Sequence, residues 1–226
     1  MNSEKAVPAD TAHLSLTRQA IVERNHALWG HEVCIIGEPL EHAYNEALRH
    51  ISPRRKTSSS ASQTFLRVDQ SVLMNENFIK QIIQAARALE EHTQLLTLSI
   101  DNPLDALPGP VERRTMVRQL YRLKDQCDVQ LAFSNYRLDT KQADLLVDLK
   151  LYDFIKMPFP DSALRLSLNT RSDLFDRLYD RMLELISATR VRFIADNVEF
   201  DDSALLAKNL PFEYFQGGYY SPADRL

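Results

Sequence analysis

The chain has 226 residues, of which 44% are hydrophobic and 26% charged, and its formal net charge is -4. That length allows one domain with a sizeable core, and the acidic balance argues against a nucleic-acid partner, because nucleic-acid-binding domains are usually basic. The 5 glycines argue against a glycine-rich phosphate loop, and the 2 cysteines, Cys34 and Cys127, cannot form a disulfide framework or a zinc site.

The polar residues 1–12 predict a flexible N-terminal tail, and residues 13–226 predict one domain. The tail lacks the apolar core of a signal peptide. No apolar run approaches the ~20 residues that a helix needs to cross a bilayer. We therefore expect a cytoplasmic protein without membrane contacts.

Strand and helix patterns alternate along the domain. Apolar runs at 20–22 and 31–36 predict strands, residues 39–51 have helical spacing, and the Ser-rich segment 52–63 predicts a surface loop. Further predicted strands cover 65–68, 95–100, 129–133, 152–157, 191–195 and 214–216, and further helices cover 75–92, 111–126, 140–149, 172–188 and 203–208. This alternation predicts parallel strands joined by crossover helices.

An open doubly wound sheet and a closed barrel both have this alternation. The open sheet usually carries a glycine-rich turn after its first strand, which this chain lacks. A barrel collects polar side chains at the carboxyl ends of its strands. Polar residues follow the apolar runs at Asp69, Asp101, Asn135, Lys156, Asp196 and Gln216. The pattern therefore favours a closed α/β barrel.

Several short motifs then resemble one family. The sequence ADNVE at 195–199, followed by QGGYYSP at 216–222, resembles the late motifs of EAL domains, the bacterial cyclic-di-GMP phosphodiesterases. FIKM at 154–157, RQAIV at 18–22 and GHEVC at 30–34 stand in the order of the family's other motifs. The resemblance covers residue 14 to the end and implies a modified, TIM-like (β/α)8 barrel of the EAL type. The short interval between Glu32 and Asp69 implies a shortened N-terminal region.

The resemblance also implies a two-metal phosphodiesterase site, of which this chain lacks most parts. Such a site needs several converging anionic oxygens, and Mg²⁺ demands near-octahedral oxygen ligands. Of the positions of the family's ligands, Glu32 and Asp196 still hold acids, and Asp69 stands where the family has an asparagine. The other positions hold Ser99, Ser134, Asn135 and Pro158.

We therefore expect no catalytic residue, no metal ligand, no cofactor and no phosphodiesterase activity. A weak residual activity stays open only if Asp101 took the place of the missing glutamate.

Cyclic di-GMP is a candidate ligand even without hydrolysis. The candidate contacts are Gln19, Glu32, Arg137, Lys156, Asp196, Glu199 and Gln216. Ile36 stands where the resemblance implies a phosphate-binding arginine, which weakens this reading, whereas Arg137 is an added cation that could compensate. The alternative for Lys156 and Glu199 is a plain ion pair at the barrel mouth.

The leading expectation is a catalytically inactive, EAL-like regulatory protein that acts by binding another protein. The alternative is a metal-independent receptor for cyclic di-GMP. The Ser-rich loop 52–63 and the helix 172–188 are the candidate partner surfaces. EAL domains often pair, but residues 138–141 depart from the family's pattern after the central motif, so a monomer and a homodimer are both compatible with the sequence.

Overall fold

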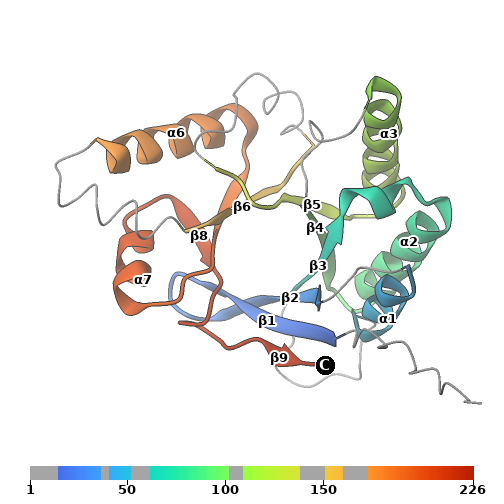
Figure 1. The fold of residues 1–226 in the computed structure, drawn as a ribbon, viewed down its shortest axis with the longest axis horizontal. Coiled ribbons are helices and arrows are strands. Elements are labelled where there is room, and N and C mark those ends of the chain that lie inside the picture. The colour runs from blue at the N-terminus through green and yellow to red at the C-terminus, as the bar shows by residue number, and fades with distance from the viewer. Residues whose placement is uncertain (1–14, 37–40, 52–61, 102–108, 138–150, 160–172) are drawn as a thin grey trace, which may run out of the picture.

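The computed structural model describes residues 15–36, 41–51, 62–101, 109–137, 151–159 and 173–226, and in this part eight strands close into a barrel with helices outside it (Figure 1). The strands are β1 (Ser15–Glu23), β2 (Leu28–Ile36), β3 (Gln63–Asp69), β4 (Leu95–Asp101), β5 (Gln130–Phe133), β6 (Phe154–Pro158), β7 (Arg192–Asp196), β8 (Phe212–Phe215) and the short β9 (Asp224–Arg225). The helices are α1 (Glu41–Ile51), the 3-10 helix η1 (Gln70–Met74), α2 (Glu76–Glu90), α3 (Pro110–Gln126), α6 (Leu174–Thr189) and α7 (Asp201–Lys208). The predicted α/β barrel is confirmed.

The barrel closes through its first strand. Strands β2 to β8 pair in chain order and are parallel, whereas β1 is antiparallel to both β2 and β8. The pairing of β1 with β8 covers only Val22 and Glu23, while β9 pairs further along β1 with Thr17 and Arg18. This seam is therefore held by few backbone contacts, and side chains must complete it.

Most predicted elements lie within a few residues of the observed ones. Gln63 begins β3 rather than ending the Ser-rich loop, and β8 starts at Phe212 rather than at Tyr214. The predicted tail, the helix at 140–149 and residues 52–61 of the predicted loop lie outside the described residues.

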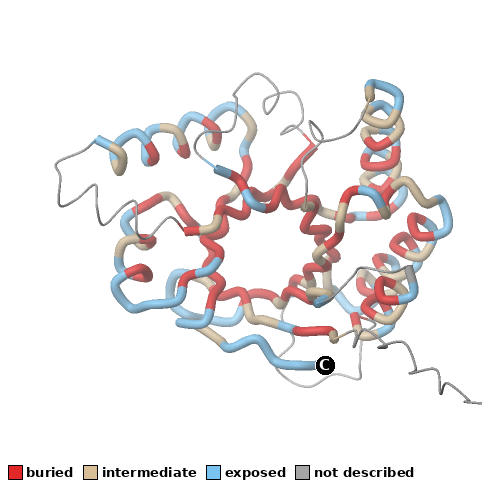
Figure 2. The backbone as a smooth tube through the Cα atoms, viewed as in Figure 1, coloured by how far each residue is buried: buried red, intermediate tan, exposed pale blue. Residues whose placement is uncertain are grey.

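Two apolar cores follow from the alternation of side chains along the strands. The smaller core fills the barrel with Ile21, Trp29, Phe65, Ala132, Phe154, Ile194 and Tyr214. Inside it the rings of Trp29 and Tyr214 stack at 3.6 Å between centroids. The larger core lies between the strands and the outer helices, and Figure 2 shows the resulting ring of buried strand residues.

The helices bury one face each against the strands. In α2 the side chain of Asn75 accepts hydrogen bonds from the backbone N–H groups of Asn77 and Phe78, which satisfies the first turn. The same helix buries Phe78, Ile79, Ile82, Ile83, Ala86 and Leu89, at the spacing expected of one helical face.

Gly217 sets the turn that follows β8, and we expect Gly217→Ala to lower the free energy of unfolding by about 3 kcal/mol. Its φ is +148°, and an added Cβ would lie 2.2 Å from the carbonyl oxygen of Val198 and 2.3 Å from its nitrogen. Both are backbone atoms that cannot move aside. Urea denaturation followed by circular dichroism measures the change.

Gly109→Ala is the matched control, because a Cβ there would approach only the Glu112 carboxylate, the mobile end of a side chain. Equal losses of stability in the two variants would contradict this account of the turn.

Candidate functional site

A buried lysine lies inside the barrel toward the carboxyl ends of the parallel strands. Lys156 on β6 is 0% exposed, Glu32 on β2 is 1% exposed and Asp196 at the end of β7 is 4% exposed. The Lys156 Nζ donates a hydrogen bond to Glu32 Oε2 at 2.5 Å and lies 3.6 Å from Asp196 Oδ2. One ammonium group therefore faces two carboxylates in an environment that water does not reach.

Strand alternation places Lys156 here. Phe154 is part of the barrel core, while Ile155 and Met157 belong to the outer core, so the side chain of Lys156 must point into the barrel. A buried charge is costly unless it is paired and hydrogen-bonded. The two carboxylates meet that requirement.

Two glutamine side chains extend the pair to the seam of the barrel. Gln216 Nε2 donates two hydrogen bonds, one to Glu32 Oε2 at 2.9 Å and one to Gln19 Oε1 at 3.1 Å. Gln19 Nε2 in turn donates to the carbonyl oxygen of Ser221 at 3.0 Å. The network thus joins β2 and β6 to β1 and to the chain after β8, where backbone pairing is short.

The electrostatics keep this pair ionised at neutral pH. Burial alone would raise the pKa of Glu32, but the charges of Lys156 and Arg67 and hydrogen bonds from Lys156 and Gln216 lower that pKa to about 2. Burial alone would lower the pKa of Lys156, but the charges of Asp196 and Glu32 hold it above its usual value. Each group therefore stabilises the charged form of the other.

A second ion pair lies at the same end of the barrel. Arg67 on β3 donates from Nε to Asp101 Oδ2 at 2.8 Å and from its Nη2 to Asp101 Oδ1 at 3.3 Å. Asn135 Nδ2 also donates to Asp101 Oδ1, at 2.9 Å. Asp101 is therefore held by neighbours, and this weakens the hypothesis that it replaces a missing ligand. Arg67 was not among the predicted site residues, although a basic residue within the apolar run 65–68 was a signal.

The structure brings most of the candidate ligand contacts together, but not all. Gln19, Glu32, Lys156, Asp196 and Gln216 form one connected group. Arg137 is exposed beyond the end of β5.

The ion pair suggested between Lys156 and Glu199 was wrong. Glu199 is exposed, and its Oε1 accepts a hydrogen bond from the backbone N–H of Gly218 at 3.2 Å. The partners of Lys156 are Glu32 and Asp196 instead. The direction of the chain explains this difference, because Asn197 has a φ of 56° and turns the backbone away just after β7.

The remaining residues at the family's ligand positions do not complete a cluster of acids. Asp69 caps η1, where its Oδ1 accepts from the N–H of Ser71 at 2.8 Å. Ser99 and Ser134 are buried, and their hydroxyls have no hydrogen-bond partner in the part of the chain that the structure describes. Within the described ranges, no group of three or more His, Cys, Asp or Glu side chains is arranged to hold a metal ion.

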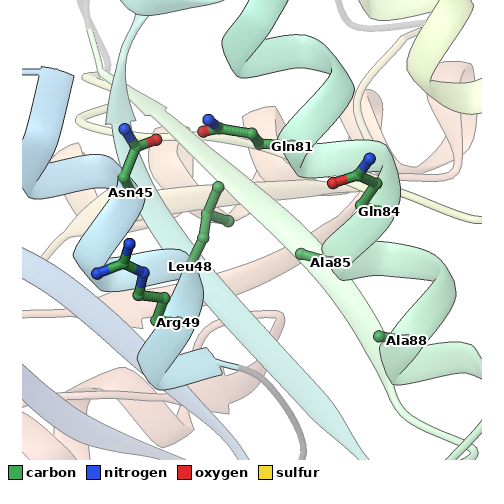
Figure 3. Close-up of a pocket in the computed structure, with 7 residues that line it drawn as sticks. All are labelled: Asn45, Leu48, Arg49, Gln81, Gln84, Ala85 and Ala88. Atoms are coloured by element: carbon green, nitrogen blue, oxygen red, sulfur yellow. The ribbon is translucent and has the colours of Figure 1, made fainter.

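A separate pocket of about 350 Å³ lies between α1 and α2, on the outside of the barrel (Figure 3). It is lined by Asn45, Leu48, Arg49, Gln81, Gln84, Ala85 and Ala88. It shares no residue with the polar layer around Lys156.

None of the described helices combines the length and apolar character that a membrane span requires.

We expect Lys156→Met to lower the free energy of unfolding by about 3 kcal/mol or more, because it leaves Glu32 and Asp196 as buried charges without a cation. Chemical denaturation at pH 7 measures the loss. Lys80→Met is the control, since Lys80 is exposed on α2, and its effect should stay within about 0.5 kcal/mol. Similar effects of the two substitutions would contradict a structural role for the buried pair.

The same pair predicts a dependence of stability on pH. The pKa of Glu32 is lower in the folded chain than its ordinary value of 4.5, so its contribution is present above that value and is lost as the pH falls toward about 2. Glu32→Gln should reduce stability at neutral pH and flatten the acid limb of the profile. Urea denaturation at a series of pH values tests this, and an unchanged acid limb would count against the assignment.

Solved structures that contain an EAL domain resemble this fold, at low sequence identity. The EAL domain of Mycobacterium smegmatis DcpA is 16% identical and covers 93% of this chain and 91% of its own, with a TM-score of 0.69. Bacillus subtilis YkuI, solved with substrate c-di-GMP and calcium, is 17% identical over 92% of this chain and 54% of its own, with a TM-score of 0.71. The Xanthomonas citri FimX EAL domain, in complex with c-di-GMP, is 13% identical over 94% of this chain and 88% of its own, with a TM-score of 0.65.

A further match is the EAL enzyme Bd1971 in its cGMP-bound form, which is 14% identical over 93% of this chain, with a TM-score of 0.68. This chain spans 62% of the length of that protein. No protein-family model and no curated protein matched the sequence. The similarity therefore concerns architecture, and the chain has the fold of EAL domains.

Proposed function

We propose that this chain is a regulatory protein with the EAL fold that does not hydrolyse cyclic di-GMP and acts by binding another protein. One observation carries the proposal: three acids at the barrel mouth are paired with cations of the protein itself. Glu32 and Asp196 share Lys156, and a separate arginine holds Asp101. The point on which Glu32 and Asp196 converge is occupied by the Lys156 ammonium, and among the described residues no group of three or more His, Cys, Asp or Glu side chains is arranged to hold an ion.

The metal ions that the fold family implies do not match this donor set. Two-metal hydrolysis needs several anionic oxygens directed at the same ions. Here Asp69 caps η1, Ser99 and Ser134 are neutral, and Pro158 offers no side-chain donor. An ion that took Glu32 and Asp196 would also leave the buried ammonium of the neighbouring lysine without a partner, which is strongly unfavourable.

An apolar residue at the mouth supports a protein partner. Ile36 ends β2 and is 53% exposed. The resemblance implies an arginine that contacts phosphate at this position. An exposed isoleucine gives no charge-assisted hydrogen bond to a phosphate, but it can bury apolar area against a protein surface.

A metal-independent receptor for cyclic di-GMP is the second candidate. Glu32 Oε1 and Gln216 Oε1 are buried acceptors without a hydrogen-bond partner among the described residues, and guanine edges carry N–H donors. The YkuI and FimX structures contain c-di-GMP. This candidate requires that the nucleotide reach the polar layer without disrupting the ion pair of Lys156.

The two candidates differ in one set of assays on the purified chain. We expect no loss of cyclic di-GMP above the protein-free blank with Mg²⁺ or Mn²⁺, measured by chromatography, because the acids already have cationic partners. We also expect no heat of binding when cyclic di-GMP is titrated with and without these ions.

Metal-dependent hydrolysis that Asp196→Asn abolishes would overturn the proposal and make the chain an enzyme. Low-micromolar binding that Gln216→Ala removes, while circular dichroism shows the variant folded, would favour the receptor. Arg137→Ala tests the other candidate contact, which is exposed beyond the end of β5, and it should weaken the same binding if this cation meets a phosphate of the nucleotide.

A further inference from the structure

Helix α6 has a wider apolar face than the barrel covers. It buries Leu178, Met182 and Leu185. A second stripe runs beside this buried face and consists of Phe175, Tyr179, Leu183 and Ile186. These positions recur at helical spacing and therefore share one side of the helix. We call them the outer stripe.

The outer stripe is accessible at its centre. Tyr179 is 39% exposed and Leu183 is 43% exposed, while Phe175 and Ile186 at its ends are partly buried against the core. Figure 2 shows exposed and half-buried positions recurring along this helix, which lies on the outside of the barrel. Large apolar side chains that line up on one face, rather than occurring singly, mark interaction surfaces.

The charges on α6 have an uneven arrangement. Arg177 pairs with Asp173 at 3.2 Å, and the other arginine of the helix, Arg181, pairs with a glutamate one turn on. Asp176 and Asp180 are exposed and have no ion pair among the described residues. Asp176 lies three positions before Tyr179 and Asp180 three positions before Leu183, and residues at this spacing are neighbours on a helix surface, so both acids border the outer stripe.

The stripe continues into a cleft of about 530 Å³. Ile186 lines this cleft together with Phe212 and Tyr214, and Glu23 and Glu213 add two further acids. The other lining residues are Arg24, Asn25 and Pro211.

The charge of Arg24 is directed elsewhere. Its guanidinium group donates to the backbone carbonyl oxygens of Lys208, Leu210 and Phe212, at 2.7, 3.2 and 2.8 Å. The surface formed by the outer stripe and the cleft therefore offers apolar contacts beside acids that lack a partner.

We propose that this surface docks an amphipathic helix of a partner protein, whose apolar side chains contact Tyr179 and Leu183 and whose lysines or arginines contact Asp176 and Asp180. The inference rests on the proposed function and names the surface that would carry it. Anchors at i, i+4 and i+7 are the usual pattern of helix recognition. Basic side chains beside the apolar face of the partner helix would supply the positive charges that pair with these two acids.

A second copy of this chain is the less favourable occupant. Two α6 helices packed through their outer stripes would bring the unpaired acids of both copies into the same contact. Like charges at an interface oppose binding. The charge pattern therefore favours a partner of opposite charge over self-association.

Two labelled peptides test the proposal on the full chain by fluorescence anisotropy. Both are of about 18 residues with leucines at helical spacing, one with lysine and one with glutamate at every polar position. We expect the lysine peptide to bind at least about tenfold more tightly than the glutamate peptide at low ionic strength.

Matched variants then locate the contact. Tyr179→Ala should weaken the binding of the lysine peptide about tenfold. Tyr121→Ala is the control, since Tyr121 on α3 is 53% exposed, and it should leave this binding unchanged. Asp180→Lys should weaken the binding of the lysine peptide and strengthen the binding of the glutamate peptide. Asp125→Lys on α3 makes the same change of charge at another exposed site and should alter neither.

The proposal is overturned if the lysine peptide does not bind, or if each variant acts no more strongly than its control. It is also overturned if sedimentation shows a dimer that Tyr179→Ala dissociates, because the occupant would then be a second copy. Hydrolysis of cyclic di-GMP is assayed separately. Hydrolysis would overturn the proposed function, whereas the peptide measurements alone decide whether this surface docks a helix.

Discussion

The buried ammonium of Lys156 is the constraint on which the interior of the barrel depends. It contacts carboxylates from two strands, and Gln216 carries the network across to the seam where β1 meets β8. Because a buried charge needs its partners, Glu32 and Asp196 are committed to the fold. We propose that the same acids are for this reason not available as ligands for metal ions. The absence of hydrolysis that we propose would then follow from the ion pairs that hold the barrel together.

Much of the architecture could be predicted from the sequence. Apolar runs separated by helical spacing indicated parallel strands with crossover helices, and the polar residues after those runs indicated a barrel. The antiparallel β1 could not be derived from that pattern, since side-chain alternation does not distinguish strand direction. The stacking of Trp29 on Tyr214 inside the barrel also depends on strands far apart in the chain.

The pairing of charges was the least predictable part of the site. Lys156 and Glu32 are separated by 124 positions, and only the closed barrel brings them together. Glu199 is much nearer to Lys156 in sequence, yet the turn at Asn197 directs it outward. Arg67 lies beside Ser99 in the strand register, and Asp69 lies beside Asp101, so the bond between Arg67 and Asp101 runs diagonally across two strands.

The ion pairs of Lys156 and Arg67 show that a chain can have the fold of EAL domains with its own arrangement of charges inside the barrel. The strands, the crossover helices and the tight turn after β8 keep the EAL architecture, while the polar layer has a composition of its own. Function resides in sites that a fold carries rather than in the fold itself. A barrel whose buried lysine is paired internally still has an outer surface with which to act. On α6, apolar side chains lie beside two acids that have no ion pair among the described residues.

Direct measurement of Mn²⁺ binding tests whether Glu32, Asp196 and Asp101, which are paired with Lys156 and Arg67, are unavailable to metal ions. Electron paramagnetic resonance reports free Mn²⁺ during titration of the chain at neutral pH. The account predicts that the signal of free Mn²⁺ stays equal to that of a protein-free solution throughout the micromolar range. Saturable, stoichiometric binding that Asp196→Asn removes would contradict it.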